Sequence, residues 1–384
     1  MQSMIPLHHA RIIFVFGSLD LGGAERQGLL LAESLRNDYG AEVEVWGLKN
    51  SPGRLSELCE EKGLPWRGVK CGWGRYALTR LAKLGKFALT LRKRQPDAIL
   101  AYTRLPNLVC GIAWHFTGAR IMVWNQRDEG LLLKDGFWER LAVRNASCFI
   151  SNSLAGKVFL EKLYRVPSRK ISVIHNGILL SARAPEATAW RKKLQIPEGT
   201  PTACMIANIH HYKDHHTLLR AWALVTLKDS PPPVLLLAGR IDEGGDELLT
   251  LAEQLGISER VKLLGQVDDV GGLLRSVDVC VHSSVSEGLP NAVLEAMAAG
   301  IAVAGTDIPG IREAVGPDGY RFLAPVRDVE RLASSLAELL QDKLLRERVG
   351  ALMLERAKAE FDVGELCART AALLAREMTA DESL

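Results

Sequence analysis

Two glutamates, Glu287 and Glu295, are separated by seven residues, in a segment that we expect to run from a loop into a helix. Pro290 suits the first position of a helix, where its missing N–H costs nothing. Residues 292–299 are strong helix formers, and Gly300 follows them at the position where a helix commonly ends in a left-handed cap. Glu287 is therefore expected in the loop, and Glu295 about five residues into the helix.

A helix start between two carboxylates can bind a phosphorylated sugar. The backbone N–H groups of residues 288–291 would lie at the positive end of the helix dipole, which is a ready site for a phosphate. Carboxylates accept hydrogen bonds well from vicinal hydroxyls, such as those of ribose and hexoses. The segment therefore fits a ligand made of a sugar, a diphosphate and a second sugar. The alternative is a plain strand–helix turn with surface carboxylates.

The segment Ser283–Gly300 closely resembles the signature of the retaining glycosyltransferases of the two-domain GT-B type, in particular family 4. The resemblance continues through Val303–Glu313 and upstream through Leu264–Val270. It implies that Glu287 binds the transferred sugar, that Glu295 binds the ribose of a nucleotide, and that the residues between them hold the diphosphate. The further donor-binding residues that it implies are Val267, Gly288, Leu289, Pro290 and Asn291.

The bulk composition indicates a two-domain α/β protein. The 384 residues exceed what one hydrophobic core usually supports, and 47% hydrophobic with 24% charged residues is ordinary for this class. Residues 1–180 carry 26 Lys and Arg against 15 Asp and Glu, a net charge of +11, whereas residues 181–384 carry 22 against 30, a net charge of −8. The basic first half suggests that it faces something anionic.

Cysteine usage and hydropathy bear on the compartment. The seven cysteines are scattered and never spaced as C-x-x-C, which argues for a reducing compartment and against zinc or a disulfide framework. No apolar run reaches the ~18 residues needed to span a bilayer, and Ile12–Phe16 is too short for the core of a signal peptide. We expect a cytoplasmic protein, with peripheral contact to the inner face of the cytoplasmic membrane as an open alternative.

Alternation of apolar runs with helical segments predicts an α/β fold with two Rossmann-like, doubly wound parallel sheets. The first series of expected strands is 11–17, 42–48, 98–102, 120–124, 148–151 and 171–174. The second series is 201–209, 234–239, 261–264, 279–282 and 302–305.

The domain boundaries follow from this rhythm and from the resemblance. We expect an N-terminal acceptor-side domain over 1–178, a polar linker over 179–200 and a nucleotide-sugar donor domain over 201–362. The resemblance implies that the two domains face each other across a cleft, and that a C-terminal helix within 363–384 returns to the first domain.

Residues 207–215 follow the first strand of the second series, at the sheet edge where such folds bind ligands. Lys213 can place a compact positive charge against a diphosphate leaving group, which makes it a candidate catalytic residue. Asn208 is a weaker donor-binding candidate, because the resemblance implies an arginine at its position. Either His210 or the helix start can compensate for that missing arginine.

A metal site is the alternative interpretation of the histidine-rich stretch after that strand. Spacing of i and i+4 can present two imidazoles on one face, and the four histidines are His210, His211, His215 and His216. We interpret them as solvated loop residues, because no acidic residue or further histidine stands at a familiar metal spacing. Asp268–Asp269 is not the Asp-x-Asp signature of metal-dependent sugar transferases. We therefore expect no metal and no cofactor.

Two further features lie in the first half of the chain. Gly22 and Gly23 follow the first strand and let a ligand approach the backbone. A tight turn is an equally good account, but the resemblance implies a donor-facing glycine loop here. Arg127 follows another strand and can pair with a phosphate or an anionic acceptor, or equally with Glu129 on the surface.

Residues 75–95 are a candidate amphipathic helix with seven basic residues and no acidic one. At ~100° per residue, one broad face holds Leu78, Leu81, Ala82, Ala88 and Leu89. Phe87 and most of the basic residues share the other face. Such a helix can rest on anionic lipid headgroups, or it can simply cover the sheet with a solvated basic face. We expect no nucleic-acid partner, because the basic face lacks interleaved aromatics.

The function that the resemblance implies is retaining, metal-independent transfer of a hexose from a nucleotide-diphosphate donor to an acceptor hydroxyl. The expected acceptor is a cell-envelope glycan or a lipid-linked saccharide. Two alternatives remain open: a sugar-nucleotide epimerase on the same fold, and a non-catalytic sugar-nucleotide-binding protein.

Overall fold

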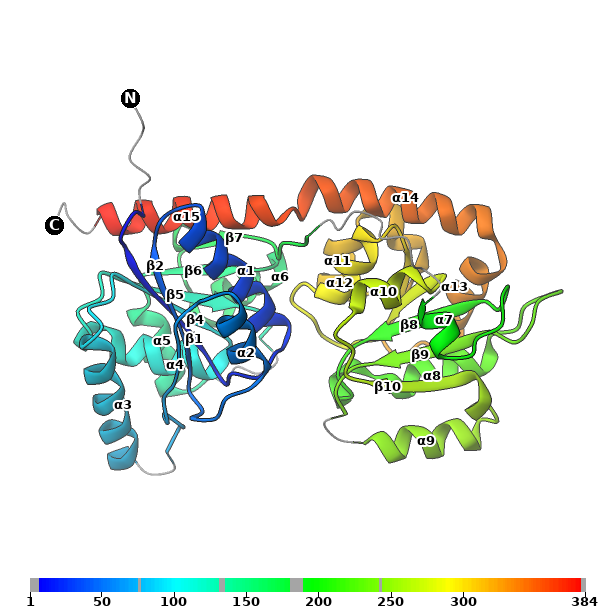
Figure 1. The fold of residues 1–384 in the computed structure, drawn as a ribbon, viewed down its shortest axis with the longest axis horizontal. Coiled ribbons are helices and arrows are strands. Elements are labelled where there is room, and N and C mark those ends of the chain that lie inside the picture. The colour runs from blue at the N-terminus through cyan, green and yellow to red at the C-terminus, as the bar shows by residue number, and fades with distance from the viewer. Residues whose placement is uncertain (1–6, 75–76, 131–134, 180–188, 242–243, 381–384) are drawn as a thin grey trace. The chain divides into compact units, whose positions relative to one another are not determined.

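The computed structural model describes residues 7–74, 77–130, 135–179, 189–241 and 244–380 (Figure 1). The chain forms two compact units. Unit 1 takes in the described residues of Met1–Gly177 and Val363–Leu384, and unit 2 those of Ile178–Asp362. Each unit is a parallel sheet with helices on both faces, so the predicted class of two Rossmann-like α/β domains is confirmed.

Unit 1 has a seven-stranded sheet among its described residues, in the order β3-β2-β1-β4-β5-β6-β7. Its strands are β1 (Arg11–Phe16), β2 (Glu42–Gly47), β3 (Trp66–Gly68), β4 (Ala98–Tyr102), β5 (Ile121–Gln126), β6 (Cys148–Ser151) and β7 (Ile171–Val173). Its helices are α1 (Gly23–Asn37), α2 (Arg54–Glu61), α3 (Ala77–Arg92), α4 (Arg104–Ala113), η1 (Trp114–Phe116), α5 (Phe137–Asn145), α6 (Leu154–Tyr164), η2 (Ser168–Lys170) and α15 (Val363–Ala380).

The sheet of unit 1 is buried on both faces, as a parallel sheet requires. Successive residues of β1 point to opposite faces, so that Phe14 belongs to one core and Ile13 to the other. The first core also contains Leu374 of α15, and α15 contacts α1. The second core contains Phe87 of α3 with residues of α4 and α5. Helices α1 and α15 therefore cover one face, and α3, α4 and α5 the other.

Unit 2 has a six-stranded sheet among its described residues, in the order β10-β9-β8-β11-β12-β13. Its strands are β8 (Thr202–Ile206), β9 (Val234–Ala238), β10 (Val261–Gly265), β11 (Val279–His282), β12 (Ala302–Thr306) and β13 (Leu323–Ala324). Its helices are α7 (Ala189–Lys193), η3 (His211–Lys213), α8 (His215–Leu224), α9 (Gly245–Gln254), η4 (Ser258–Arg260), α10 (Val270–Arg275), α11 (Asn291–Ala298), α12 (Pro309–Val315), η5 (Pro317–Phe322), α13 (Val329–Gln341) and α14 (Lys343–Glu360).

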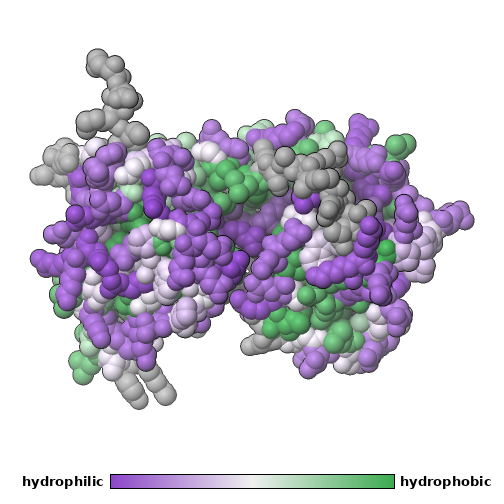
Figure 2. Space-filling model, viewed as in Figure 1, coloured by the Kyte–Doolittle hydropathy of each residue, from purple (hydrophilic) through white to green (hydrophobic). Residues whose placement is uncertain are grey.

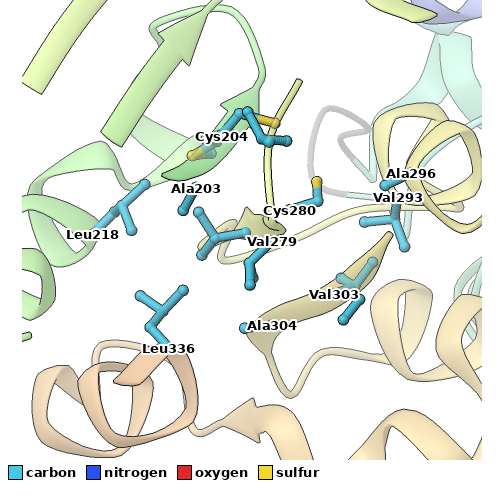
Figure 3. Packing of buried hydrophobic residues seen from close by; sticks show 14 of the residues in the cluster. Ala203, Cys204, Leu218, Val279, Cys280, Val293, Ala296, Val303, Ala304 and Leu336 are labelled. Atoms are coloured by element: carbon cyan, nitrogen blue, oxygen red, sulfur yellow. The ribbon is translucent and has the colours of Figure 1, made fainter. Parts of the chain in front are cut away.

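Small side chains in the middle of this sheet let helices approach it closely. Strands β8 and β11 pair in register, with Cys204 opposite Cys280. Figure 3 shows Cys280 on the face covered by α11, whose Val293 points toward the sheet. On the opposite face, Ala304 lies near Leu336 of α13. This packing fixes the start of α11 relative to the end of β11.

The seven cysteines are packing residues. All are buried and free. Burial raises the pKa of the Cys148 thiol to about 12, so this side chain stays protonated at neutral pH. A protonated, buried thiol is a poor nucleophile. We therefore assign no chemistry to Cys148.

Two strands and one helix differ from the sequence expectation. Strands β3 and β13 were not predicted, because they have only three and two residues and so give no recognisable apolar run. Helix α7 lies inside the stretch expected as a linker, 180–188 of which lies outside the described residues. Arg191 of α7 donates to Thr202 Oγ1 at 3.0 Å and to Ser276 O at 3.1 Å, so α7 packs as part of unit 2.

The strand order marks where a ligand can bind. In unit 2 the order reverses between β8 and β11, and in unit 1 between β1 and β4. Doubly wound sheets bind ligands at the carboxyl ends of the strands beside such a reversal. The loops that follow β8 and β11 carry Lys213 and Glu287. Both residues therefore stand at the expected ligand edge of unit 2.

Candidate active site

The loops after β8 and β11 are tied together by hydrogen bonds. Ser283 Oγ lies 2.9 Å from Lys213 O and 3.0 Å from Asp214 O, and Val285 N donates to Tyr212 O at 2.9 Å. Asp214 caps α8 by accepting a hydrogen bond from Thr217 N at 3.2 Å. The helix and the strand together fix the position of Lys213.

Glu287 is the most heavily bonded side chain of this edge. Its Oε1 accepts hydrogen bonds from Ser284 Oγ at 2.7 Å, from His282 Nε2 at 2.9 Å and from Lys213 Nζ. The Glu287 side chain is only 12% exposed. Burial alone raises its pKa, but the charge of Lys213 and the hydrogen bonds from His282 and Lys213 outweigh burial, and the pKa lies well below its usual range. Glu287 is therefore a fixed negative charge at neutral pH.

Lys213 is the matching fixed positive charge. Its side chain is 15% exposed, and Nζ lies 5.0 Å from the centroid of the Tyr212 ring. The ring restricts the side chain further, since a cation over an aromatic face is attracted to it. A buried lysine at a ligand edge can stabilise negative charge as it develops on a leaving group.

Helix α11 begins directly after this pair. The structure makes Pro290 the residue before the helix, with ψ of 116°, and not its first residue as expected. The Pro290 carbonyl nevertheless accepts hydrogen bonds from Val293 N at 3.1 Å and Leu294 N at 3.2 Å. Glu295 is the fifth residue of α11, one turn beyond Asn291 and on the same face of the helix.

The backbone of Glu287 and Gly288 rests against α12, which the sequence analysis did not anticipate. A Cβ atom at Gly310 would lie 2.2 Å from Gly288 O and 2.5 Å from Glu287 O. Only glycine fits at this distance, so Gly310 lets the first turn of α12 touch the loop. In the sequence, the Pro309–Gly310 pair within Val303–Glu313 was the available indication of this contact.

His282 is the functional candidate that sequence analysis missed. It ends β11 and is buried. With the proton on Nε2 the ring donates to Glu287, and Nδ1 is then buried without a hydrogen-bond partner among the described residues. A histidine closing a buried strand five residues before Glu287 was the only signal in the sequence.

The expectation of four solvated histidines is wrong for His215. This side chain is buried at the start of α8. Burial, together with nearby His282 and Lys213, lowers the pKa of His215 to about 4. The ring is therefore neutral at pH 7 and adds no charge beside Glu287.

The other predicted donor-side residues of unit 2 have structural contacts. Asn208 Oδ1 accepts a hydrogen bond from Arg240 N at 3.1 Å, which joins the ends of β8 and β9. Val267 is half-buried against the core of unit 2. The loop that carries Asn208 therefore also brings Arg240 to the ligand edge, a second cation that the sequence analysis overlooked.

The predicted residues of unit 1 lie at the carboxyl ends of β1 and β5. Gly22 precedes α1 and lies close to the carboxylate of Glu25, whose pKa is raised by burial. Arg127 Nη1 donates to Asn176 Oδ1 at 2.7 Å, and its guanidinium lies 4.8 Å from the centroid of the Tyr102 ring. These contacts hold Arg127 in place. Gly23 is the exposed first residue of α1.

Two family patterns match the two halves of the chain. The family described as "Glycosyltransferase Family 4" matches residues 21–181, and the family described as "Glycosyl transferases group 1" matches residues 186–352. The second range contains both Lys213 and Glu287.

Curated relatives are glycosyltransferases. The lipopolysaccharide core biosynthesis glycosyltransferase LpsE of Rhizobium meliloti is 30% identical over 54% of this chain and 57% of its own length. The N-acetylgalactosamine-N,N'-diacetylbacillosaminyl-diphospho-undecaprenol 4-alpha-N-acetylgalactosaminyltransferase of Campylobacter jejuni is 28% identical over 72% of this chain and 76% of its own length.

Solved structures share the fold. Anabaena Alr3699/HepE in complex with UDP-glucose superposes with a TM-score of 0.83 at 23% identity, over 96% of this chain and all of that one. WaaG, a glycosyltransferase involved in lipopolysaccharide biosynthesis, superposes with a TM-score of 0.71 at 17% identity, over 94% of this chain and 99% of that one. From its two family patterns, its relatives and its fold, the chain belongs to the group 1 glycosyltransferases of the GT-B type and is a glycosyltransferase.

Proposed function

We propose that the protein transfers a sugar from a nucleotide-diphosphate donor to an acceptor hydroxyl with retention of the anomeric configuration. The observation that carries this proposal is the buried Glu287–Lys213 pair directly ahead of α11. A fixed carboxylate for sugar hydroxyls and a fixed cation for phosphate stand side by side at the ligand edge of unit 2. Anabaena Alr3699/HepE, which has the same fold, was crystallised with UDP-glucose.

Each residue of this edge has a role in the proposal. Lys213 and the start of α11 hold the diphosphate, and Arg240 is the proposed source of the charge that Asn208 lacks. Glu295 binds the ribose hydroxyls, and Glu287 orients the transferred sugar. No metal is required in this scheme, because lysine, arginine and the helix dipole balance the charge of the leaving group.

Retention is implied by the family resemblance, and the proposed proton transfer is compatible with it. The pKa of Glu287 lies well below its usual range, which makes this carboxylate a poor general base at neutral pH. In the proposed step the bond from the anomeric carbon to the phosphate oxygen breaks, and the acceptor oxygen bonds to the same face of that carbon. The acceptor proton passes to the departing phosphate oxygen. Glu287 serves to position the sugar and to stabilise positive charge that develops on it.

The acceptor we propose is a lipid-linked saccharide or another precursor of a cell-envelope glycan, modified in the cytoplasm. Two relatives carry names of that kind, one in lipopolysaccharide core biosynthesis and one with a diphospho-undecaprenol substrate. The excess of positive charge in residues 1–180 suits an acceptor that carries a diphosphate. Arg127 of unit 1 is the acceptor-side cation in this proposal.

The direct test is a transfer assay with UDP-glucose or UDP-N-acetylgalactosamine and an undecaprenyl-diphosphate-linked sugar. We expect UDP release that depends on the acceptor, an α-linked product by NMR, and no loss of rate in EDTA. A β-linked product would contradict retention. An altered sugar formed without acceptor would instead indicate an epimerase, and binding of donor without turnover a sugar-nucleotide-binding protein.

A change at His282 should lower turnover without affecting donor affinity. His282→Leu removes one of the hydrogen bonds that orient Glu287, and we expect a loss of roughly tenfold in kcat. His282→Gln can present an amide N–H near the place of Nε2 and should recover most of the rate. Stopped-flow measurement of turnover and UDP titration calorimetry measure the effects on kcat and on nucleotide affinity separately. Equal losses in both variants would show that His282 is needed only for packing.

A further inference from the structure

Helix α3 exposes leucines on the side that faces away from unit 1. Leu78 is 82% exposed, Leu81 54% and Leu89 61%. The side that packs on the sheet of unit 1 is a different stripe, made of Leu84, Phe87, Ala88 and Leu91. Ala88 was expected on the same face as the exposed leucines, and Phe87 among the basic residues. Both expectations are wrong, because both residues are buried in the stripe through which α3 packs.

Basic side chains flank these leucines. The exposed ones are Lys83, Lys86, Arg92 and Lys93. None of the four forms an ion pair with a carboxylate in the part of the chain that the structure describes. No acidic residue occurs between Glu61 and Asp97, whereas ten lysines and arginines do. We name the exposed side of α3, with its three leucines and four cations, the α3 face.

Aromatic residues lie beside α3, where two tryptophans pack against the core of unit 1. Trp73, just ahead of α3, packs edge-on against Trp138 of α5 with ring centroids 5.8 Å apart, and Arg80 lies 5.1 Å over the Trp73 ring. Phe137, next to Trp138, is 72% exposed. Figure 2 shows hydrophobic surface at the lower left, where Figure 1 places α3. Tryptophans that are apolar at one end and polar at the other favour the interface between lipid and water.

We propose that the α3 face docks on the surface of an anionic lipid bilayer. The leucines of the α3 face can enter the boundary between headgroups and acyl chains, while the lysine and arginine side chains extend to the lipid phosphates. A helix with a merely solvated outer side would carry polar residues of both signs, as solvated faces usually do. No described helix is long and apolar enough to cross the bilayer, so the contact is peripheral.

Charge decides between a bilayer and a second copy of the chain as the occupant. Two α3 faces brought together would place at least eight cations around one apolar contact with no described carboxylate between them. Like charges of this kind repel, whereas anionic headgroups attract each lysine or arginine. The observations therefore favour anionic lipid.

The test is co-sedimentation of the full chain with vesicles of phosphatidylcholine alone or with about one-third phosphatidylglycerol, at low and high salt. We expect binding to the anionic vesicles only, weakened by salt. Lys83→Gln/Lys86→Gln/Lys93→Gln should weaken it roughly a hundredfold, since each basic residue near an anionic surface strengthens binding by about fivefold. Leu78→Ser/Leu81→Ser/Leu89→Ser should also weaken it, and all six positions are exposed, so folding should survive.

Matched controls lie on unit 2. Leu344 of α14 is 78% exposed beside the exposed Lys343, and Lys343→Gln/Leu344→Ser should leave vesicle binding unchanged. Binding that ignores lipid charge, or that the α3 variants and the control lower equally, would overturn the proposal. Concentration-dependent dimerisation that the α3 variants abolish would assign the face to a second copy instead. UDP titration of the same variants, without lipid or acceptor, measures nucleotide binding alone. Its result therefore bears on the proposed transfer reaction and not on vesicle binding.

Discussion

Glu287→Gln is expected to reduce sugar transfer by roughly a thousandfold and to leave UDP affinity within about twofold of the wild type. Glutamine keeps the shape of the side chain but loses the charge that stabilises positive charge on the sugar. The donors of Ser284, His282 and Lys213 all bond to the same carboxylate oxygen, and a neutral amide oxygen accepts three such hydrogen bonds less well than a charged one. Steady-state kinetics with UDP-sugar, together with UDP titration calorimetry, measures the two effects separately.

Glu295 provides the complementary variant. Glu295→Ala should weaken UDP binding by about tenfold to a hundredfold, because it removes charge-assisted hydrogen bonds to the ribose. Glu287→Ala is the harsher form of the first change, since it leaves Lys213 buried without its partner. Glu259→Gln, on the surface, serves as the neutral control. Wild-type turnover in Glu287→Gln, or loss of UDP binding in that variant alone, would contradict the roles assigned to Glu287 and Glu295.

Lys213→Met is expected to lower both turnover and stability. The loss of a cation that faces the leaving group should cost roughly a hundredfold to a thousandfold in kcat. The variant also leaves Glu287 buried without its charged partner, which costs about 3 kcal/mol and should lower Tm by roughly 6–12 °C. Turnover and thermal unfolding at pH 7 measure these losses.

The stability loss in Lys213→Met should depend on pH with a definite sign. In the wild type the pKa of Glu287 is below its unfolded value, so the pair stabilises the fold above about pH 4.3 and progressively less as the pH falls through the folded pKa. In the variant the hydrogen bond from His282 remains, but the charge of Lys213 no longer offsets burial, so the pKa of Glu287 is higher than in the wild type. The difference in Tm should therefore be largest near pH 7 and shrink below about pH 4. Lys213→Arg, which keeps the charge, should retain most of the stability, and a difference in Tm that is independent of pH would contradict the pairing.

Much of the fold could be predicted from the sequence because parallel strands are continuous apolar runs. The expected strand 279–282 matches β11, and the ends of its neighbours β8 and β12 differ from expectation by at most three residues. Edge strands such as β13, with two residues, give no such signal. The buried side of α3 was missed because a helix with two apolar stripes does not reveal which one meets the sheet.

The candidate site was only partly predictable for a different reason. Glu287 and Glu295 stand within one short segment, where local spacing is informative. Lys213 is 74 residues from Glu287, and only the resemblance to a known family linked the two. The roles of His282 and the burial of His215 depend on how α8 meets β11, which is a tertiary contact that no local pattern encodes.

The missing side chain at position 310 couples the start of α12 to the loop that carries Glu287. Because α12 presses on the carbonyls of Glu287 and Gly288, any side chain there would push the carboxylate out of reach of its three donors. Substitution at 310 should thus lower turnover more than it lowers the stability of the fold. A variant that tolerates alanine at 310 would have to relocate the whole turn ahead of α11.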